Sequence, residues 1–159
     1  MKISVIIPVF NEAKTLAEVV KMVERVNIDK EIIAVDDGST DGSSDVLRQL
    51  ADERRIKLIR HENNYGKGAA IKTGLKAASG DIIIIQDADL ETDPQDYYEL
   101  VRPIIEGKTR AVFGFRININ TANIYWWGGK LVSFITSLLY GGNIKDVNNG
   151  YKVMTRDLW

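Results

Sequence analysis

Short apolar runs alternate with amphipathic stretches, and this alternation constrains the fold more than any other feature of the chain. Four runs are apolar and rich in β-branched residues, as in strands buried on both faces; they are 3–9, 31–35, 56–60 and 81–86. Helical patterns follow them, at about 11–26, 43–52, 69–78 and 94–105. This order predicts an α/β fold with a mostly parallel sheet and helices on both faces. A strand at 110–115, a helix at 124–139 and a polar loop at 146–151 are expected to complete it.

Composition limits the classes of function. The 159 residues fit a single domain over 1–159. The net charge is −1 and no basic block contains interleaved aromatic residues, which argues against a nucleic-acid partner. The absence of cysteine excludes disulfides, thiolate catalysis and zinc–thiolate sites, and agrees with a cytoplasmic location. No apolar run is long enough to span a bilayer; Gly128, Gly129 and Lys130 interrupt the nearest candidate, at 124–140.

Polar clusters follow the predicted strands. They lie at 8–12, 36–41, 65–68 and 87–91. The carboxyl ends of parallel strands meet at one edge of a sheet, where ligands of open α/β folds bind. We therefore expect the four clusters to form one ligand site.

Three carboxylates, Asp87, Asp89 and Glu91, occupy alternate positions after the most apolar strand. In an extended chain all three would point to one side. Such a group repels itself unless a cation lies within it, and oxygen ligands suit Mg²⁺ or Mn²⁺ shared with substrate phosphates. The alternative is a helix N-cap cluster before Pro94.

The other clusters carry groups suited to a nucleotide. Asp37 can accept hydrogen bonds from a base or ribose while Asp36 caps a turn, although turn chemistry alone explains the whole segment. Phe10 can pack on a base and Glu12 can hold a ribose; the alternative is a strand end and a helix cap.

Gly66-Lys67-Gly68 precedes a predicted helix and can bring backbone N–H groups and an ammonium toward phosphate. The alternative is a glycine-eased turn with a solvated lysine, and neither a Walker motif nor G-x-G-x-x-G is present. His61, the only histidine, is predicted to be a loop residue without a catalytic role.

Aromatic residues gather in 124–140, namely Trp126, Trp127, Phe134 and Tyr140. Core packing explains them. Peripheral contact with the cytoplasmic face of a membrane is the alternative, because Trp and Tyr favour interfaces.

Taken together, the motifs resemble those of family 2 glycosyltransferases. They are SVIIPVFNE (4–12), VDDGSTD (35–41), NYGKG (64–68), GDIIIIQDADLE (80–91) and NGYK (149–152). The nearest branch is the polyprenol-phosphate glycosyltransferases, such as those that make dolichyl-phosphate mannose and glucose. The resemblance implies a GT-A fold and an inverting transfer of a hexose from a UDP-sugar or GDP-mannose to polyprenyl or dolichyl phosphate.

The resemblance also assigns roles to residues. It implies a nucleoside pocket, donor contacts from Asp87 and Ala88, and a Mg²⁺ or Mn²⁺ site at Asp89 and Glu91. Arg116 matches an arginine near the phosphates, where Lys67 can assist, and Asp146 matches the acidic start of a late D-x-x-x-G motif and is the candidate base for a hydroxyl acceptor. The implied pocket residues are Pro8, Phe10, Glu12, Val35 and Asp37.

The chain departs from the family pattern at Phe115, Asn148 and Asn149. Family members usually continue well past this point, so we expect the domain to be truncated at its C-terminus. Two other functions stay open: a non-catalytic nucleotide-sugar binding domain and a sugar-nucleotide nucleotidyltransferase. The second usually has a Gly-rich basic loop where this chain has 8–12.

Overall fold

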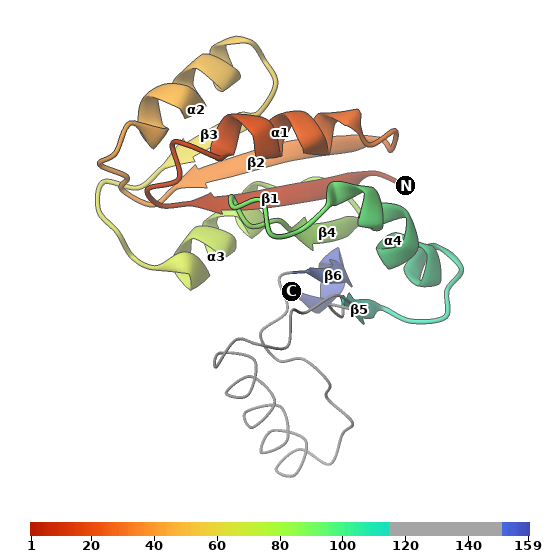
Figure 1. Cartoon of the computed structure of the whole chain (residues 1–159). Helices are drawn as coiled ribbons and strands as arrows, with labels where there is room; N and C mark the ends of the chain where they lie inside the picture. The colour runs from red at the N-terminus through yellow and green to blue at the C-terminus, as the bar shows by residue number, and fades with distance from the viewer. Residues whose placement is uncertain (115–150) are drawn as a thin grey trace, which may run out of the picture.

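The computed structural model describes residues 1–114 and 151–159 (Figure 1). Strands and helices alternate over most of this range. The elements are β1 (Ile3–Val9), α1 (Leu16–Arg25), β2 (Lys30–Asp36), α2 (Ser43–Asp52), β3 (Lys57–Arg60), α3 (Lys67–Ala77), β4 (Ile82–Ile85), η1 (Pro94–Asp96), α4 (Tyr97–Ile105), β5 (Ala111–Phe113), β6 (Lys152–Thr155) and η2 (Arg156–Leu158).

The described strands form one sheet in the order β3-β2-β1-β4-β6-β5. β1 lies between β2 and β4 and is parallel to both, with Ile6 opposite Ile33 on one side and Ile85 on the other. β3 is parallel to β2. β6 runs antiparallel to its neighbours β4 and β5. The predicted mostly parallel sheet is therefore confirmed, with β6 as the reversed strand.

Helices cover both faces of the sheet, as predicted. Helices α1, α2 and α4 pack on the face that receives the odd-numbered residues of β1, such as Val5 and Ile7, in the largest core cluster. Helix α3 packs on the opposite face, against Ile6, Ile83 and Ile33. Successive strand side chains point to opposite faces, so burial of both faces explains why β1 and β4 read as continuous apolar runs.

Helix α3 lies unusually close to β1. A Cβ on Gly74 would be only 2.5 Å from Ile6 Cγ2, so only glycine fits between the helix and the strand. This contact fixes the position of α3, whose first residue, Lys67, lies at the ligand edge of the sheet.

A carboxylate joins three segments at the opposite edge of the sheet. Glu31 accepts hydrogen bonds from Ser4 Oγ of β1, from Ser79 N and Oγ before β4, and from Lys2 Nζ. Burial raises the pKa of Glu31, but these hydrogen bonds outweigh it and lower the pKa from 4.5 to about 2.

Two boundaries differ from the prediction for local reasons. Helix α1 begins at Leu16 instead of about residue 11, because Asn11 has a left-handed φ of 58° and its side chain accepts a hydrogen bond from Thr40 N. Helix α3 begins at Lys67, two residues earlier than predicted. The predicted helix at 124–139 lies outside the described residues. Within the described ranges, no helix is long and apolar enough to cross a membrane.

Candidate functional site

A cavity of about 260 Å³ opens at the carboxyl ends of β1, β2 and β4. All four polar clusters identified in the sequence contribute to its wall. The lining residues are Pro8, Val9, Phe10, Glu12, Asp37, Asn64, Gly66, Lys67, Ala70, Asp87, Ala88 and Asp89. The prediction that the four clusters meet in one place is therefore confirmed.

The two aspartates that end β2 have separate positions. Asp36 is fully buried and accepts hydrogen bonds from Ser39 N (2.9 Å) and Ser44 Oγ, so it caps the turn that leads to α2. Asp37 is the one that lines the cavity. This division matches the prediction that Asp36 caps the turn, and it leaves Asp37 at the cavity, where its role toward a ligand stays a prediction.

Asp37 is held by three donors. Its Oδ1 accepts hydrogen bonds from His61 Nδ1 (2.7 Å) and Tyr65 N (3.0 Å), and its Oδ2 accepts one from Gly66 N (2.7 Å). Burial raises the pKa of Asp37, but the three hydrogen bonds lower it by more, so the pKa is below its ordinary value. Asp37 therefore presents a fixed, charged acceptor at the cavity, where it can pair with an N–H or O–H of a ligand.

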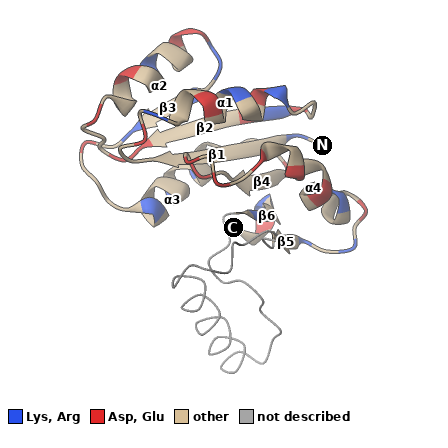
Figure 2. Ribbon diagram, in the orientation of Figure 1, with Lys and Arg blue, Asp and Glu red and all other residues tan. Residues whose placement is uncertain are grey.

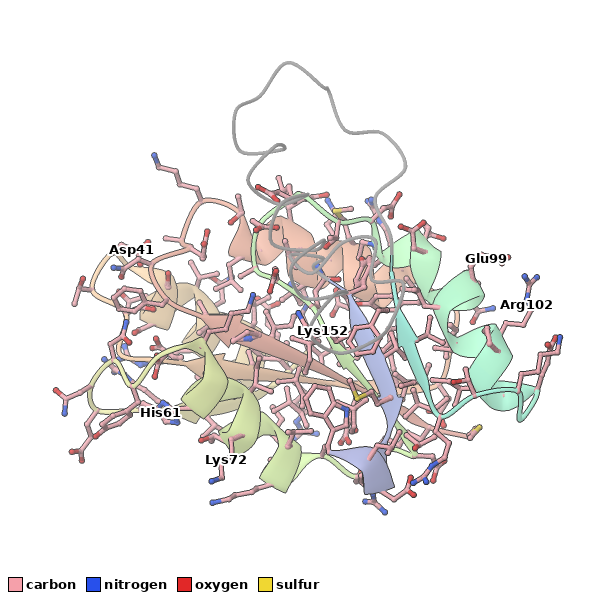
Figure 3. All side chains as sticks on the ribbon, turned by 90° about the horizontal axis from the view of Figure 1, so that it is seen from below. Asp41, His61, Lys72, Glu99, Arg102 and Lys152 are labelled. Carbon is pink, nitrogen blue, oxygen red and sulfur yellow. The ribbon has the colours of Figure 1, made fainter. Side chains whose placement is uncertain are left out.

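His61 does not line the cavity and lies beside α3 (Figure 3). While Nδ1 donates to Asp37, Nε2 is 2.9 Å from Thr73 Oγ1 of α3, which can donate to it. The prediction of a plain loop residue missed this link, since His61 and Asp37 follow different strands and their contact has no local sequence signal.

Positive charge approaches the cavity from α3. The helix begins at Lys67, so its N-terminal end, where backbone N–H groups favour anions, faces the cavity. Lys67 Nζ lies 2.6 Å from Asp87 Oδ1. Gly66 N is engaged by Asp37 and Asn64, so it is not free to bind phosphate as the sequence had suggested.

The acidic loop between β4 and η1 is bent over 88–92 (Figure 2), so the chain is not extended there, and the condition under which the three carboxylates would point to one side is not met. Asp87 and Asp89 line the cavity, but Glu91 is exposed and does not. Asp89 Oδ1 accepts a hydrogen bond from Glu91 N, a local turn. The bend reflects turn chemistry that the alternating spacing did not reveal.

Asp87 has an oxygen suited to a cation. Oδ1 is buried and receives no hydrogen bond from the described residues; its close contact is the Lys67 ammonium. The described residues contain no preformed group of three potential metal ligands. Two carboxylates at the cavity, one of them paired with the Lys67 ammonium, fit Mg²⁺ or Mn²⁺, which commonly takes one or two carboxylates and completes its shell with water and substrate phosphates.

A second contact anchors the acidic loop to α1. Thr15 Oγ1 donates a hydrogen bond to Ala88 O (2.7 Å) and lies 3.3 Å from Glu12 Oε2. The buried Ala88 therefore stays at the cavity wall, next to Glu12.

One predicted pocket residue lies away from the cavity, and two predicted site residues are not described by the structure. Val35 is fully buried under α3, in a cluster with Ile33 and Ala70, and does not line the cavity. Arg116 and Asp146 lie outside the described residues. Asn64 and Ala70, which the sequence did not single out, do line the cavity.

The sequence profile of glycosyl transferase family 2 matches residues 4–158. The chain therefore belongs to this family. This membership sets aside the nucleotidyltransferase alternative and agrees with the cavity, which gathers the predicted donor-contacting residues except Val35.

Two curated relatives are polyprenol-phosphate sugar transferases, the branch that the motifs resemble. The undecaprenyl-phosphate 4-deoxy-4-formamido-L-arabinose transferase of Aeromonas hydrophila is 37% identical over 111 residues, which are 66% of this chain and 34% of that protein. The dolichol-phosphate mannosyltransferase of Pyrococcus furiosus is 34% identical over 114 residues, 70% of this chain and 32% of that protein. The chain thus spans about a third of the length of these relatives.

The fold also matches a solved enzyme. Glucosyl-3-phosphoglycerate synthase from Mycobacterium tuberculosis, in complex with Mn²⁺, UDP-glucose and phosphoglyceric acid, superposes with a TM-score of 0.77 and 26% identity over 99% of this chain and 57% of that chain. The predicted GT-A fold is thereby confirmed.

Proposed function

We propose that this chain forms the donor-binding part of a metal-dependent, inverting glycosyltransferase. It binds a nucleotide-diphosphate sugar, a UDP-sugar or GDP-mannose, and transfers the hexose to polyprenyl phosphate. The cavity carries the proposal, because it joins the fixed carboxylate of Asp37 to Lys67 and to the Asp87–Asp89 pair. The two curated relatives support the class of acceptor, and the complex of the M. tuberculosis enzyme supports the class of donor.

The order of groups around the cavity suits the parts of such a donor. Asp37 and the exposed ring of Phe10 would hold the nucleoside, since a carboxylate pairs with base or ribose and an aromatic ring packs on a base. Lys67 and the start of α3 would face the diphosphate. Asp87 and Asp89 would hold the metal ion, which supplies positive charge to the leaving diphosphate.

In the transfer step an acceptor phosphate oxygen forms a bond to the anomeric carbon of the hexose. The bond from that carbon to the donor diphosphate breaks, and the nucleotide diphosphate leaves with the electron pair. A lipid phosphate is already an anion near pH 7, so no proton has to be removed from it. Lys67 can stabilise the charge on the departing diphosphate. The roles of Arg116 and Asp146 stay predictions.

Binding of UDP and GDP, each with and without Mn²⁺, tests the proposal. We expect one nucleotide to raise the melting temperature in a metal-dependent manner, because a ligand that binds only the folded state stabilises it. Asp89→Asn should remove the dependence on metal. Glu99→Gln is the matched control, because Glu99 pairs with Arg102 on the outer side of α4, far from the cavity (Figure 3).

An unchanged metal-dependent affinity in Asp89→Asn would contradict the metal assignment. Release of sugar from the donor with Mn²⁺, or its transfer to polyprenyl phosphate, separates an enzyme from a non-catalytic nucleotide-sugar binding domain. Nucleotide binding without either reaction would support the second function.

A further inference from the structure

A buried amide lies directly behind the acidic loop. Gln86 follows β4, is fully buried, and immediately precedes Asp87. A buried glutamine has two donors and two acceptor sites to satisfy, and leaving any of them without a partner destabilises the fold. The arrangement of its partners therefore shows what this residue holds in place.

Every hydrogen-bonding position of the Gln86 amide is occupied. Oε1 accepts from Tyr97 OH (2.8 Å) and Tyr151 OH (3.1 Å). Nε2 donates to Asp87 O and to Thr92 Oγ1, both at 2.9 Å. The carbonyl of Asp87 can only accept, so Nε2 must face the loop and Oε1 must face the two tyrosines.

The amide thus joins the two ends of the acidic loop. Asp87 is its first residue and Thr92 lies at its far end, so the two Nε2 hydrogen bonds close the loop around Asp89. The tyrosines brace the other side of the amide: Tyr97 begins α4, Tyr151 precedes β6, and their rings meet edge to face with centroids 5.7 Å apart. Burial raises the pKa of both tyrosines, which therefore remain O–H donors.

We propose that Gln86, held by Tyr97 and Tyr151, is a positioning residue that keeps the 87–92 loop in the conformation in which Asp87 and Asp89 face the cavity. The proposal rests on the proposed function for the meaning of those two carboxylates. Gln86 itself does not line the cavity, so it acts only through the loop. A merely structural role in the core would instead affect overall stability and leave the loop unchanged.

Two variants disrupt the hydrogen bonds of Gln86 in different ways. Gln86→Met keeps the approximate volume and removes all four hydrogen bonds. The double variant Tyr97→Phe/Tyr151→Phe keeps the packing and removes the two donors to Oε1, together with the hydrogen bond between Tyr151 and Thr92, so it covers the case in which Gln86→Met does not fold. Tyr98→Phe is the matched control, because Tyr98 is the next residue of α4 but is 44% exposed and its OH accepts a hydrogen bond from Asn27 N.

Two measurements are needed on each variant. The first is the affinity for UDP and for GDP with and without Mn²⁺. In Gln86→Met and in the double tyrosine variant, we expect the increase of nucleotide affinity by Mn²⁺ to fall about tenfold, as for other residues that orient metal ligands. The affinity without metal should stay the same. The second is hydrogen exchange of the 87–92 amides without ligand, which should become faster in these two variants and not in Tyr98→Phe.

The outcomes are separable. If the variants that remove the Gln86 hydrogen bonds fold and the hydrogen exchange of the loop is unchanged, the proposal is overturned. Faster exchange of the loop with an unchanged increase of nucleotide affinity by Mn²⁺ overturns it as well. If the unaltered chain binds neither nucleotide in a metal-dependent manner, the proposed function fails. In that case the exchange data alone decide whether Gln86 holds the loop.

Discussion

Two side chains of the site, Lys67 and His61, act on carboxylates that belong to other elements. Lys67 reaches from α3 to Asp87 after β4, and His61 reaches from the end of β3 to Asp37 after β2. Each contact joins segments that are separated in sequence but adjacent at the ligand edge of the sheet. Their roles can be tested one residue at a time.

Lys67→Ala should change two affinities in opposite directions. The ammonium competes with a cation for Asp87, and an exposed ion pair is worth about 0.2–1 kcal/mol, so Mn²⁺ alone should bind up to about fivefold more tightly. The nucleotide with Mn²⁺ should bind about tenfold more weakly, because a charge-assisted contact with the diphosphate is lost. Titration calorimetry measures both.

Lys72→Ala is the matched control for this prediction, because Lys72 is exposed on the same helix (Figure 3). It should change neither affinity. If Lys67→Ala changes the affinity for Mn²⁺ alone and the affinity for the nucleotide with Mn²⁺ in the same direction, Lys67 does not pair with Asp87 in the free protein and with phosphate in the complex.

His61→Ala should weaken nucleotide binding by about five- to tenfold, since hydrogen bonds to charged groups contribute about 1.5–3 kcal/mol and only part of this reaches the ligand. His61→Asn should retain more affinity, because its amide can donate to Asp37 as Nδ1 does. Equilibrium binding of UDP and GDP to both variants checks the order. Equal nucleotide affinities of His61→Ala and His61→Asn would argue against positioning of Asp37 by His61.

At the scale of elements, the local pattern predicted most of the fold. The continuous apolar runs identified β1, β2 and β4, because burial on both faces of a parallel sheet leaves an unbroken signal. The reversal of β6 had no such signal, since it depends on pairing with Ile82–Ile85, which is about 70 residues away in sequence. The location of the cavity could be predicted from the strand ends, and the bend at 88–92 is local turn chemistry that the alternate spacing of the carboxylates does not reveal. The hydrogen bonds of Gln86 to the two tyrosines and the His61–Asp37 contact could not be predicted, because only tertiary packing brings these residues together.

The contact of α3 with β1 predicts opposite effects for two glycines of the same helix. Gly74→Ala should lower the free energy of unfolding by about 1–3 kcal/mol, because its Cβ would overlap Ile6 and push the helix from the sheet. Gly68→Ala meets no atom within 4 Å and should gain about 0.5–1 kcal/mol from helix propensity. Urea unfolding of both variants measures the difference, and a fully stable Gly74→Ala would contradict the close approach.

At the scale of the whole molecule, Glu31 links the pH of the solution to the stability of the sheet. Its pKa is about 2 in the folded protein and 4.5 ordinarily, so the unfolded chain binds the proton more tightly. The stabilisation by the carboxylate is therefore complete above about pH 5 and disappears as the pH falls toward 2. The donors to Glu31 come from β1, from the segment before β1 and from the segment before β4.

Glu31→Gln should accordingly be less stable than the unaltered chain by a constant amount above pH 5, and the difference should shrink at lower pH. Urea unfolding at several pH values measures it. Glu99→Gln serves as the control, because the Glu99–Arg102 pair is exposed and such pairs contribute little. A stability difference for Glu31→Gln that does not change below pH 5 would rule out the carboxylate as its cause.

The position of β6 in the sheet has a consequence for biosynthesis. β6 separates β4 from β5, and 66 residues lie between Ile85 and Lys152. At a translation rate of about 5–20 residues per second, the ribosome needs roughly 3–13 seconds to make this stretch. During that interval the four isoleucines of β4 have an unpaired edge, and unpaired apolar edges template aggregation. We therefore expect the nascent chain to be most prone to aggregation after β4 has emerged and before β6 has.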